Sequence, residues 1–138
     1  MPFPVGHKQK KEDCFRCCLA YMLDWSPRSV PFYEPQGPGK DSKFWDDYKL
    51  WVSERLGLTL ACFGKEAVDV FSEYDRNWIA SVPSNCNDGI EHAVVMKGAK
   101  LEYDPSHTRV QRPKKFLNAT VLADNYKSHN DGTCTFIY

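Results

Sequence analysis

The sequence places one cysteine, Cys14, where a helix is expected to begin. Cysteine attacks carbonyl carbon as a thiolate, and the unpaired amides and macrodipole of a helix N-terminus favour that charged form. Asp13, directly before it, is a residue type typical of the N-cap position. Cys14 is therefore the first candidate for a catalytic nucleophile, and the chemistry it would support is attack on an acyl carbon.

A cysteine nucleophile needs a base, and the chain offers four histidines. His7, His107 and His129 lie in polar, loop-like sequence, whereas His92 stands near the start of the β-prone run from Glu91 to Met96. A strand is a rigid element that can aim an imidazole at a neighbouring thiol. We therefore expect His92 to be the base.

The hairpin that follows His92 supplies a group to orient it. With a turn centred on Gly98, antiparallel pairing sets His92 directly opposite Asp104. Opposed residues have Cβ atoms roughly 4.5–5.5 Å apart, near enough for a carboxylate to accept the imidazole N–H, although a one-residue bulge would change this register. The predicted constellation is Cys14, His92 and Asp104.

Acyl transfer also requires donors for the oxyanion of the tetrahedral intermediate. The backbone N–H of Cys14 is one donor at a helix start, and the side-chain amide of Gln9, a few residues upstream, is the candidate for the second. This mechanism uses no metal and no organic cofactor, so none is expected.

The cysteines also allow other interpretations. Free cysteine is among the most buried residue types, so Cys14 alone would more often be a core thiol. Cys17 and Cys18 fall on the apolar face of the predicted helix and are assigned to packing. Zinc binding is the chemical rival, because Cys14 and Cys17 form a CxxC pair and Cys86 and His92 follow. The pair lies inside an apolar helical pattern instead of a turn, which disfavours a zinc knuckle.

These residues resemble a known family. The stretch from Gln9 to Ala20, with its Asp13-Cys14 pair, is similar to the opening of compact papain-like cysteine peptidases, especially those that remove double-glycine leaders from bacteriocins. The runs His92-Ala93-Val94-Val95 and Tyr103-Asp104-Pro105 resemble their histidine and aspartate strands. The chain also looks like a group of small uncharacterised bacterial and phage proteins with this pattern.

The resemblance implies a papain-like fold with a Cys14, His92 and Asp104 triad, and Gln9 as the oxyanion-hole residue. It implies hydrolysis of a peptide, isopeptide or related amide bond in a protein or peptide substrate. Two alternatives share the scaffold: a non-catalytic binding protein that engages a host protein, and a thiol acyltransferase that passes the acyl group to an amine. Substrate identity and oligomeric state stay open.

Two helices are predicted to come first and to position the nucleophile. The first begins at Cys14 and should end at Ser26-Pro27, because proline cannot continue the helical backbone. Its buried face is predicted to consist of Cys14, Cys17, Cys18, Tyr21, Met22 and Trp25. The second is predicted from about Ser42 to Leu56, capped by Asp41 or Ser42 and stopped by Gly57.

Short β-prone runs follow, separated by Pro, Gly, Asn and Asp. They are Leu58 to Phe63, Trp78 to Val82, Glu91 to Met96, Lys100 to Tyr103 and Thr133 to Tyr138. Helices first and strands afterwards predict an α+β domain, in which the N-terminal helices pack on one side of an antiparallel sheet.

Length and composition predict one soluble domain over residues 1–138, with 42% hydrophobic residues. No apolar stretch is long enough to span a membrane, and the lysines near the start are not followed by an apolar segment, so a cytoplasmic protein with reduced cysteines is expected. Lys+Arg and Asp+Glu both number 18, so no net positive field would attract nucleic acid. The short basic run from Arg109 to Lys115 is predicted to be a solvated loop.

Overall fold

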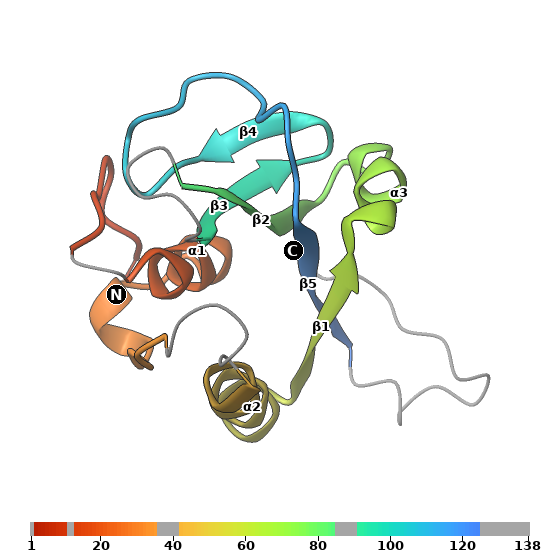
Figure 1. Ribbon diagram of the computed structural model, residues 1–138. Helices are drawn as coiled ribbons and strands as arrows, with labels where there is room; N and C mark the ends of the chain where they lie inside the picture. Colours follow the sequence, from red (N-terminus) through yellow and green to blue (C-terminus); the bar gives the residue numbers. More distant parts are fainter. Residues whose placement is uncertain (1, 11–12, 36–41, 85–90, 125–138) are drawn as a thin grey trace.

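The structure is a computed structural model that describes residues 2–10, 13–35, 42–84 and 91–124. Helices α1 (Cys14–Leu23) and α2 (Ser42–Trp51) precede an antiparallel sheet, and α3 (Val68–Ser72) follows its first strand (Figure 1). The strands are β1 (Leu58–Gly64), β2 (Asn77–Pro83), β3 (Glu91–Lys97), β4 (Lys100–Tyr103) and β5 (Asn118–Asp124). The fold is therefore α+β, as predicted. Each helix of the described part is too short or too polar to cross a lipid bilayer.

Helix α1 is buried on nearly all sides, whereas the sequence predicted one buried face. One side packs on β3, and the Phe15 ring on another side makes edge-to-face contacts with Trp45 and Tyr48 of α2, at centroid distances of 5.0 and 4.9 Å. The buried residues are Phe15, Cys17, Cys18, Leu19, Ala20, Met22 and Leu23. A helix held between a second helix and a sheet needs apolar residues around most of its circumference.

Helix α1 ends at Leu23, before the predicted stop. Asp24 adopts the left-handed conformation (φ 55°), and the Trp25 amide donates to the Ala20 carbonyl (2.9 Å). This arrangement satisfies the last helical carbonyls, and aspartate tolerates the left-handed region better than most residues. The prediction that Ser26-Pro27 ends the helix is therefore wrong. Pro27 instead begins the 3₁₀ turn η1 (Pro27–Ser29), where its fixed φ suits a first helical position.

Helix α2 continues directly into a π-helical turn, η2 (Val52–Leu56), so helical structure covers the predicted range from Ser42 to Leu56. Gly57 ends it in the left-handed conformation (φ 64°), which confirms the predicted stop. Tyr48 is fully buried on the face that meets α1, and its hydroxyl donates to the Pro31 carbonyl (2.9 Å). Asp41, one of the two predicted caps, lies outside the described residues.

The sheet has the strand order β1-β5-β2-β3-β4, with every neighbouring pair antiparallel. The four predicted strands that fall within the described residues correspond to β1 through β4. Strand β5 was not predicted, because a short strand buried on both faces has no alternation that separates it from a buried helical segment. Helix α3 was also not predicted. The predicted strand from Thr133 to Tyr138 lies outside the described residues.

The two faces of the sheet carry separate apolar clusters. Helices α1 and α2 cover one face, where Ile79, Val95 and Leu122 point into the larger cluster. The other face packs against α3 and against Phe116, a residue of the long connection between β4 and β5. Residues that alternate along β3 therefore enter different clusters, and its first residues lie where the α1 side and the β4–β5 connection meet.

Candidate functional site

Cys14 is the first residue of α1, and its side chain is partly exposed. Asp13 occupies the N-cap position, as predicted, but its carboxylate makes no capping hydrogen bond to the helix. With φ −103° and ψ 27° its backbone is not in the extended region typical of a cap, and the carboxylate turns back to accept the Lys10 amide (2.9 Å). The Asp13 side chain thus leaves the free backbone amides at the start of α1 without a capping hydrogen bond.

The two other cysteines of this helical turn have a different environment. Cys17 and Cys18 are both 0% exposed within the larger apolar cluster, which confirms their assignment to packing. Burial, followed by the nearby Asp13 carboxylate, raises the pKa of Cys17 to about 12. Burial likewise raises the pKa of Cys18 well above its ordinary value. Both thiols stay protonated at neutral pH, so of these three cysteines Cys14 alone is placed to react.

His92 and Asp104 are in direct contact. The imidazole Nε2 donates to the Asp104 Oδ1 across 2.7 Å, and the residues are 7% and 5% exposed. The predicted contact between these side chains is therefore confirmed. Because Nε2 is held by the carboxylate, Nδ1 is the ring nitrogen that remains for a thiol.

The strand register behind this contact differs from the predicted one. A bulge follows the tight two-residue turn between β3 and β4, and beyond it Val95 pairs with Tyr103. Continued by one residue, that register sets Asp104 opposite Val94 and not opposite His92. The prediction of direct opposition is therefore wrong, because the turn has two residues and is not centred on Gly98, and the bulge then adds a second one-residue shift. His92 and Asp104 meet diagonally, beyond the last ladder pair.

The protonation of His92 reflects its two partners. Burial lowers the pKa of the imidazole, but the hydrogen bond to Asp104 and the Cys14 side chain, which lies within hydrogen-bonding reach, together outweigh burial and raise it to about 9. His92 is therefore an imidazolium at neutral pH, held between a carboxylate and a sulfur. The structure thus brings together Cys14, His92 and Asp104.

A short loop after β4 encloses the Asp104 carboxylate. Its Oδ1 accepts the amide and hydroxyl of Ser106 (2.9 and 2.7 Å), and its Oδ2 accepts the Thr108 hydroxyl (3.3 Å) and the Arg109 amide (3.0 Å). Burial alone would raise the pKa of Asp104, but the hydrogen bonds from His92 and Ser106 outweigh it and hold that pKa well below its usual range. Asp104 is therefore ionised whenever the protein is folded near neutral pH.

These loop residues were not identified from the sequence. A signal was present, because Asp followed by Ser and Thr at the second and fourth positions is typical of turns in which the carboxylate accepts nearby donors. Arg109 also departs from the predicted solvated loop. Its side chain is only 13% exposed, its Nη1 lies 3.7 Å from the Asp104 Oδ2, and its Nη2 donates to the Pro83 carbonyl (2.6 Å). The prediction is wrong for Arg109 because these buried acceptors lie close to the loop.

Gln9, the predicted oxyanion-hole residue, lies beside the same loop. Its backbone amide donates to the carbonyl of Pro105, the residue after Asp104 (2.8 Å). Its side-chain Oε1 is buried and makes no hydrogen bond to a described residue. No hydrogen bond joins the Gln9 and Cys14 side chains within the described ranges. The structure therefore tethers Gln9 to the Asp104 loop and leaves the role of its amide a prediction.

The remaining candidates for base or metal ligand are His7, His107, His129 and Cys86. The His107 side chain contacts the backbone carbonyl of His7 (3.0 Å), and His129 lies outside the described residues. Cys86, part of the alternative zinc interpretation, also lies outside them. Among the described residues, no three side chains of His, Cys, Asp or Glu type converge as metal ligands would.

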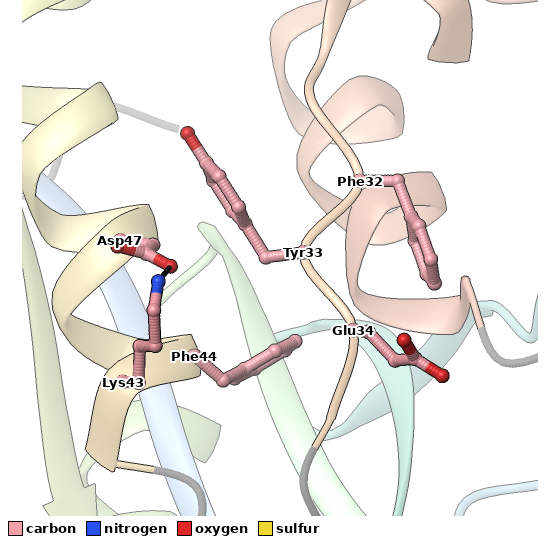
Figure 2. A pocket seen from close by; sticks show the side chains of 6 residues that line it. All are labelled: Phe32, Tyr33, Glu34, Lys43, Phe44 and Asp47. Atoms are coloured by element: carbon pink, nitrogen blue, oxygen red, sulfur yellow. Dashed lines mark hydrogen bonds and ion pairs between the residues drawn. The ribbon is translucent and has the colours of Figure 1, made fainter.

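A small pocket lies between the segment that follows η1 and the start of α2 (Figure 2). Its volume is ≈ 180 Å³, below the range of roughly 300–1,000 Å³ typical of ligand pockets. It is lined by Phe32, Tyr33, Glu34, Lys43, Phe44 and Asp47. An ion pair between Lys43 and Asp47 (2.6 Å) lies on its α2 side, and the Phe44 ring also contacts Phe15, which follows Cys14 (centroids 5.7 Å). The pocket is thus small, and the contact between the Phe44 and Phe15 rings connects its wall to the start of α1.

Comparison of the chain with protein-family models, with curated proteins and with solved structures gave no match.

Proposed function

We propose that the protein is a papain-like cysteine hydrolase that cleaves a peptide, isopeptide or related amide bond. The observation that supports this best is the position of the His92 imidazole, with Asp104 hydrogen-bonded to its Nε2 and the Cys14 side chain as its second interaction partner. An arrangement of nucleophile, base and orienting carboxylate is what thiol-dependent acyl transfer requires.

At the start of the reaction the proton shared by Cys14 and His92 lies on the ring, and the Cys14 thiolate forms a C–S bond with the substrate carbonyl carbon. The carbonyl π electrons move to oxygen, and the Cys14 N–H and the Gln9 side-chain amide donate hydrogen bonds to that oxyanion. The C–N bond then breaks as His92 gives its proton to the leaving nitrogen. The products are an amine and a thioester on Cys14.

In the second half His92 takes a proton from water, and the resulting hydroxide attacks the thioester carbonyl. The C–S bond breaks, the acid departs, and Cys14 leaves as a thiolate beside the ring that now holds the proton from water, which restores the starting state. Asp104 keeps its charge throughout, holding the ring and stabilising the imidazolium that forms in both halves. The raised pKa of His92, about 9, ensures that the ring holds the proton needed by the leaving nitrogen at neutral pH.

The thiol of such an enzyme must stay reduced, and the described cysteines Cys14, Cys17, Cys18 and Cys62 are all free. A reducing compartment such as the cytoplasm suits this chemistry. We therefore expect the substrate to be a protein or peptide of that compartment.

Selective alkylation tests the nucleophile. At pH 7 an ordinary thiol is only a few per cent ionised, so a Cys14 thiolate should react with iodoacetamide about 30-fold faster than such a thiol. Cys62 is the internal control, because it is exposed although burial of its sulfur raises its pKa. Peptide mass spectrometry should find Cys14 labelled first, and His92→Ala should slow that labelling. Equal labelling of Cys14 and Cys62 would contradict the proposal.

A trapping experiment separates a hydrolase from a binding protein. The Cys14→Ala variant should retain a substrate protein that the wild type cleaves when the two are mixed. A captured protein that emerges intact from incubation with wild type would favour a non-catalytic partner instead. Release of the acyl group onto an added amine in preference to water would identify a transferase.

A further inference from the structure

The contact between His92 and Asp104 is not held by the strand ladder alone. The last ladder pair on this side is Val95 with Tyr103, beyond a bulge, so Asp104 follows the end of β4. The hydrogen bonds from Ser106, Thr108 and the Arg109 amide orient the carboxylate, but these donors follow Asp104 in the chain and do not tie it to β3. Another structural element must fix the distance between Asp104 and the start of β3.

The Arg109 side chain makes that connection. Its Nη1 lies 3.7 Å from the Asp104 Oδ2, and its backbone amide donates to the same oxygen (3.0 Å). Its Nη2 donates to the Pro83 carbonyl (2.6 Å). One guanidinium, 13% exposed, therefore touches both the carboxylate and the end of β2. We call this arrangement the Arg109 bridge.

The end of β2 is the part of the sheet that carries His92. Pro83 pairs with Glu91, and Val82 pairs with His92, in an antiparallel ladder without a shift. A fixed Pro83 carbonyl therefore fixes the backbone of His92. The Arg109 bridge ties Asp104 to the neighbour of His92 by a route that does not pass through the bulged hairpin.

We propose that Arg109 is a positioning residue for the His92 and Asp104 pair. Its charge lies beside the Asp104 Oδ2, which its backbone amide also contacts, and this leaves Oδ1 to accept from the His92 Nε2, while the Nη2 bond to Pro83 holds the β2–β3 end at the correct distance. A planar guanidinium can donate to Pro83 from Nη2 and pair with Asp104 through Nη1, whereas a lysine ammonium is a single point charge on a flexible stem. The roles of His92 as base and Asp104 as orienting group rest on the proposed function, but the contacts among Arg109, Asp104 and His92 do not depend on it.

The diagnostic variant is Arg109→Lys, which keeps a positive charge near Asp104 and removes the planar group that spans Asp104 and Pro83. We expect the pKa of His92 in the variant to fall by about one unit, because a less well aimed carboxylate stabilises the imidazolium less. The His92 Nε2–H should also exchange with water about tenfold faster, as expected for a weakened hydrogen bond. Both are measured by NMR, with the His92 signals assigned from His92→Ala.

The matched control is Arg112→Lys in the same loop. Arg112 stacks on the Phe116 ring (4.8 Å) and reaches the Ser72 hydroxyl (3.5 Å), away from Asp104. This substitution should leave the pKa and Nε2–H exchange of His92 at their wild-type values. If Arg109→Lys also leaves both unchanged, even with a lower melting temperature, Arg109 is only a structural residue and the proposal is overturned.

A measurement on the wild type keeps the proposal testable if Arg109→Lys does not fold. A guanidinium held by the Pro83 carbonyl and paired with the Asp104 carboxylate should show slow rotation and resolved Nη signals by ¹⁵N NMR, whereas Arg112 should show averaged signals. Averaged Arg109 signals would overturn the bridge. These readouts concern His92 and Arg109 only, so they are distinct from failure of selective Cys14 alkylation, which would overturn the proposed function and leave the bridge standing.

Discussion

Three thiols within one turn of α1 have the same chemistry and different surroundings. Cys17 and Cys18 are enclosed by the apolar cluster, and burial raises the pKa of each. Cys14 stands at the helix start, partly exposed, beside an imidazole. At the scale of single residues, burial and one neighbouring base are what distinguish a candidate nucleophile from two core residues.

The carboxylate of Asp104 should control the protonation of His92. In Asp104→Asn the negative charge is lost and the burial of the ring dominates, so we expect the pKa of His92 to fall from about 9 to about 6.5 or lower. Alkylation of Cys14 at pH 7.5 should slow at least about tenfold, since the imidazolium that stabilises the thiolate is lost. NMR titration and the pH profile of alkylation measure these effects.

Asp13→Asn is the control for the preceding substitution. Asp13 is also a buried carboxylate near Cys14, but it accepts hydrogen bonds from the Lys10 amide and the Cys17 thiol and not from His92. The pKa of His92 should change little in this variant. A similar fall in both variants would mean that the effect is one of general negative charge and not of the Asp104 hydrogen bond.

At the scale of elements, the hairpin of β3 and β4 delivers Asp104 to His92. Its turn contains Gly98, whose backbone is left-handed (φ 57°) and whose carbonyl accepts the Trp78 indole N–H (2.9 Å). A Cβ at this position would lie 2.9 Å from the Tyr74 carbonyl oxygen. The turn therefore combines a conformational requirement with a close backbone approach, and both favour glycine.

Comparison of Gly98→Ala with Gly57→Ala separates these two requirements. Gly57 is also left-handed, but a Cβ there would meet nothing within 4 Å. We expect Gly57→Ala to cost about 1 kcal/mol of unfolding free energy and Gly98→Ala at least about 2 kcal/mol, because the second adds a backbone clash. Urea denaturation measures both. Equal losses would show that the approach of Tyr74 relaxes without cost.

At the scale of the whole molecule, the pair of His92 and Asp104 makes the stability of the fold depend on pH. The pKa of His92 is raised from its ordinary 6.5 to about 9 in the fold, so its protonated form stabilises the folded state. That contribution is complete below about pH 6.5 and is lost as the pH rises through about 9. The lowered pKa of Asp104 acts oppositely: its contribution is present above its ordinary value of 3.8 and is lost as the pH falls.

We therefore expect the free energy of unfolding to fall by an amount on the order of 3 kcal/mol between pH 6 and pH 9.5. Urea denaturation at these two pH values measures the fall in wild type and in Asp104→Asn. The fall should be much smaller in the variant, whose His92 has no raised pKa to lose. An equal fall in the two proteins would assign the pH dependence to other groups.

The sequence by itself determined two helical segments, four of the strands and the identity of the candidate residues. The start of α1 at Cys14, the helical range from Ser42 to Leu56 and the strands around His92 and Asp104 follow from periodicity, turn residues and caps, which act over a few neighbouring residues. The meeting of His92 with Asp104 followed because they flank one short hairpin.

The tertiary structure alone decided the insertion of β5 between β1 and β2, the bulged register and the burial of Arg109. The place of β5 and the Pro83 contact of Arg109 depend on segments distant in the chain, and no local pattern encodes which distant strand or carbonyl becomes a neighbour. The bulge lies within one hairpin, and the order of residue types gives no signal for its one-residue shift. The tertiary structure also decided the pKa values of His92 and Asp104, because these values depend on how far the fold buries each side chain and on which hydrogen-bond partners it places beside them.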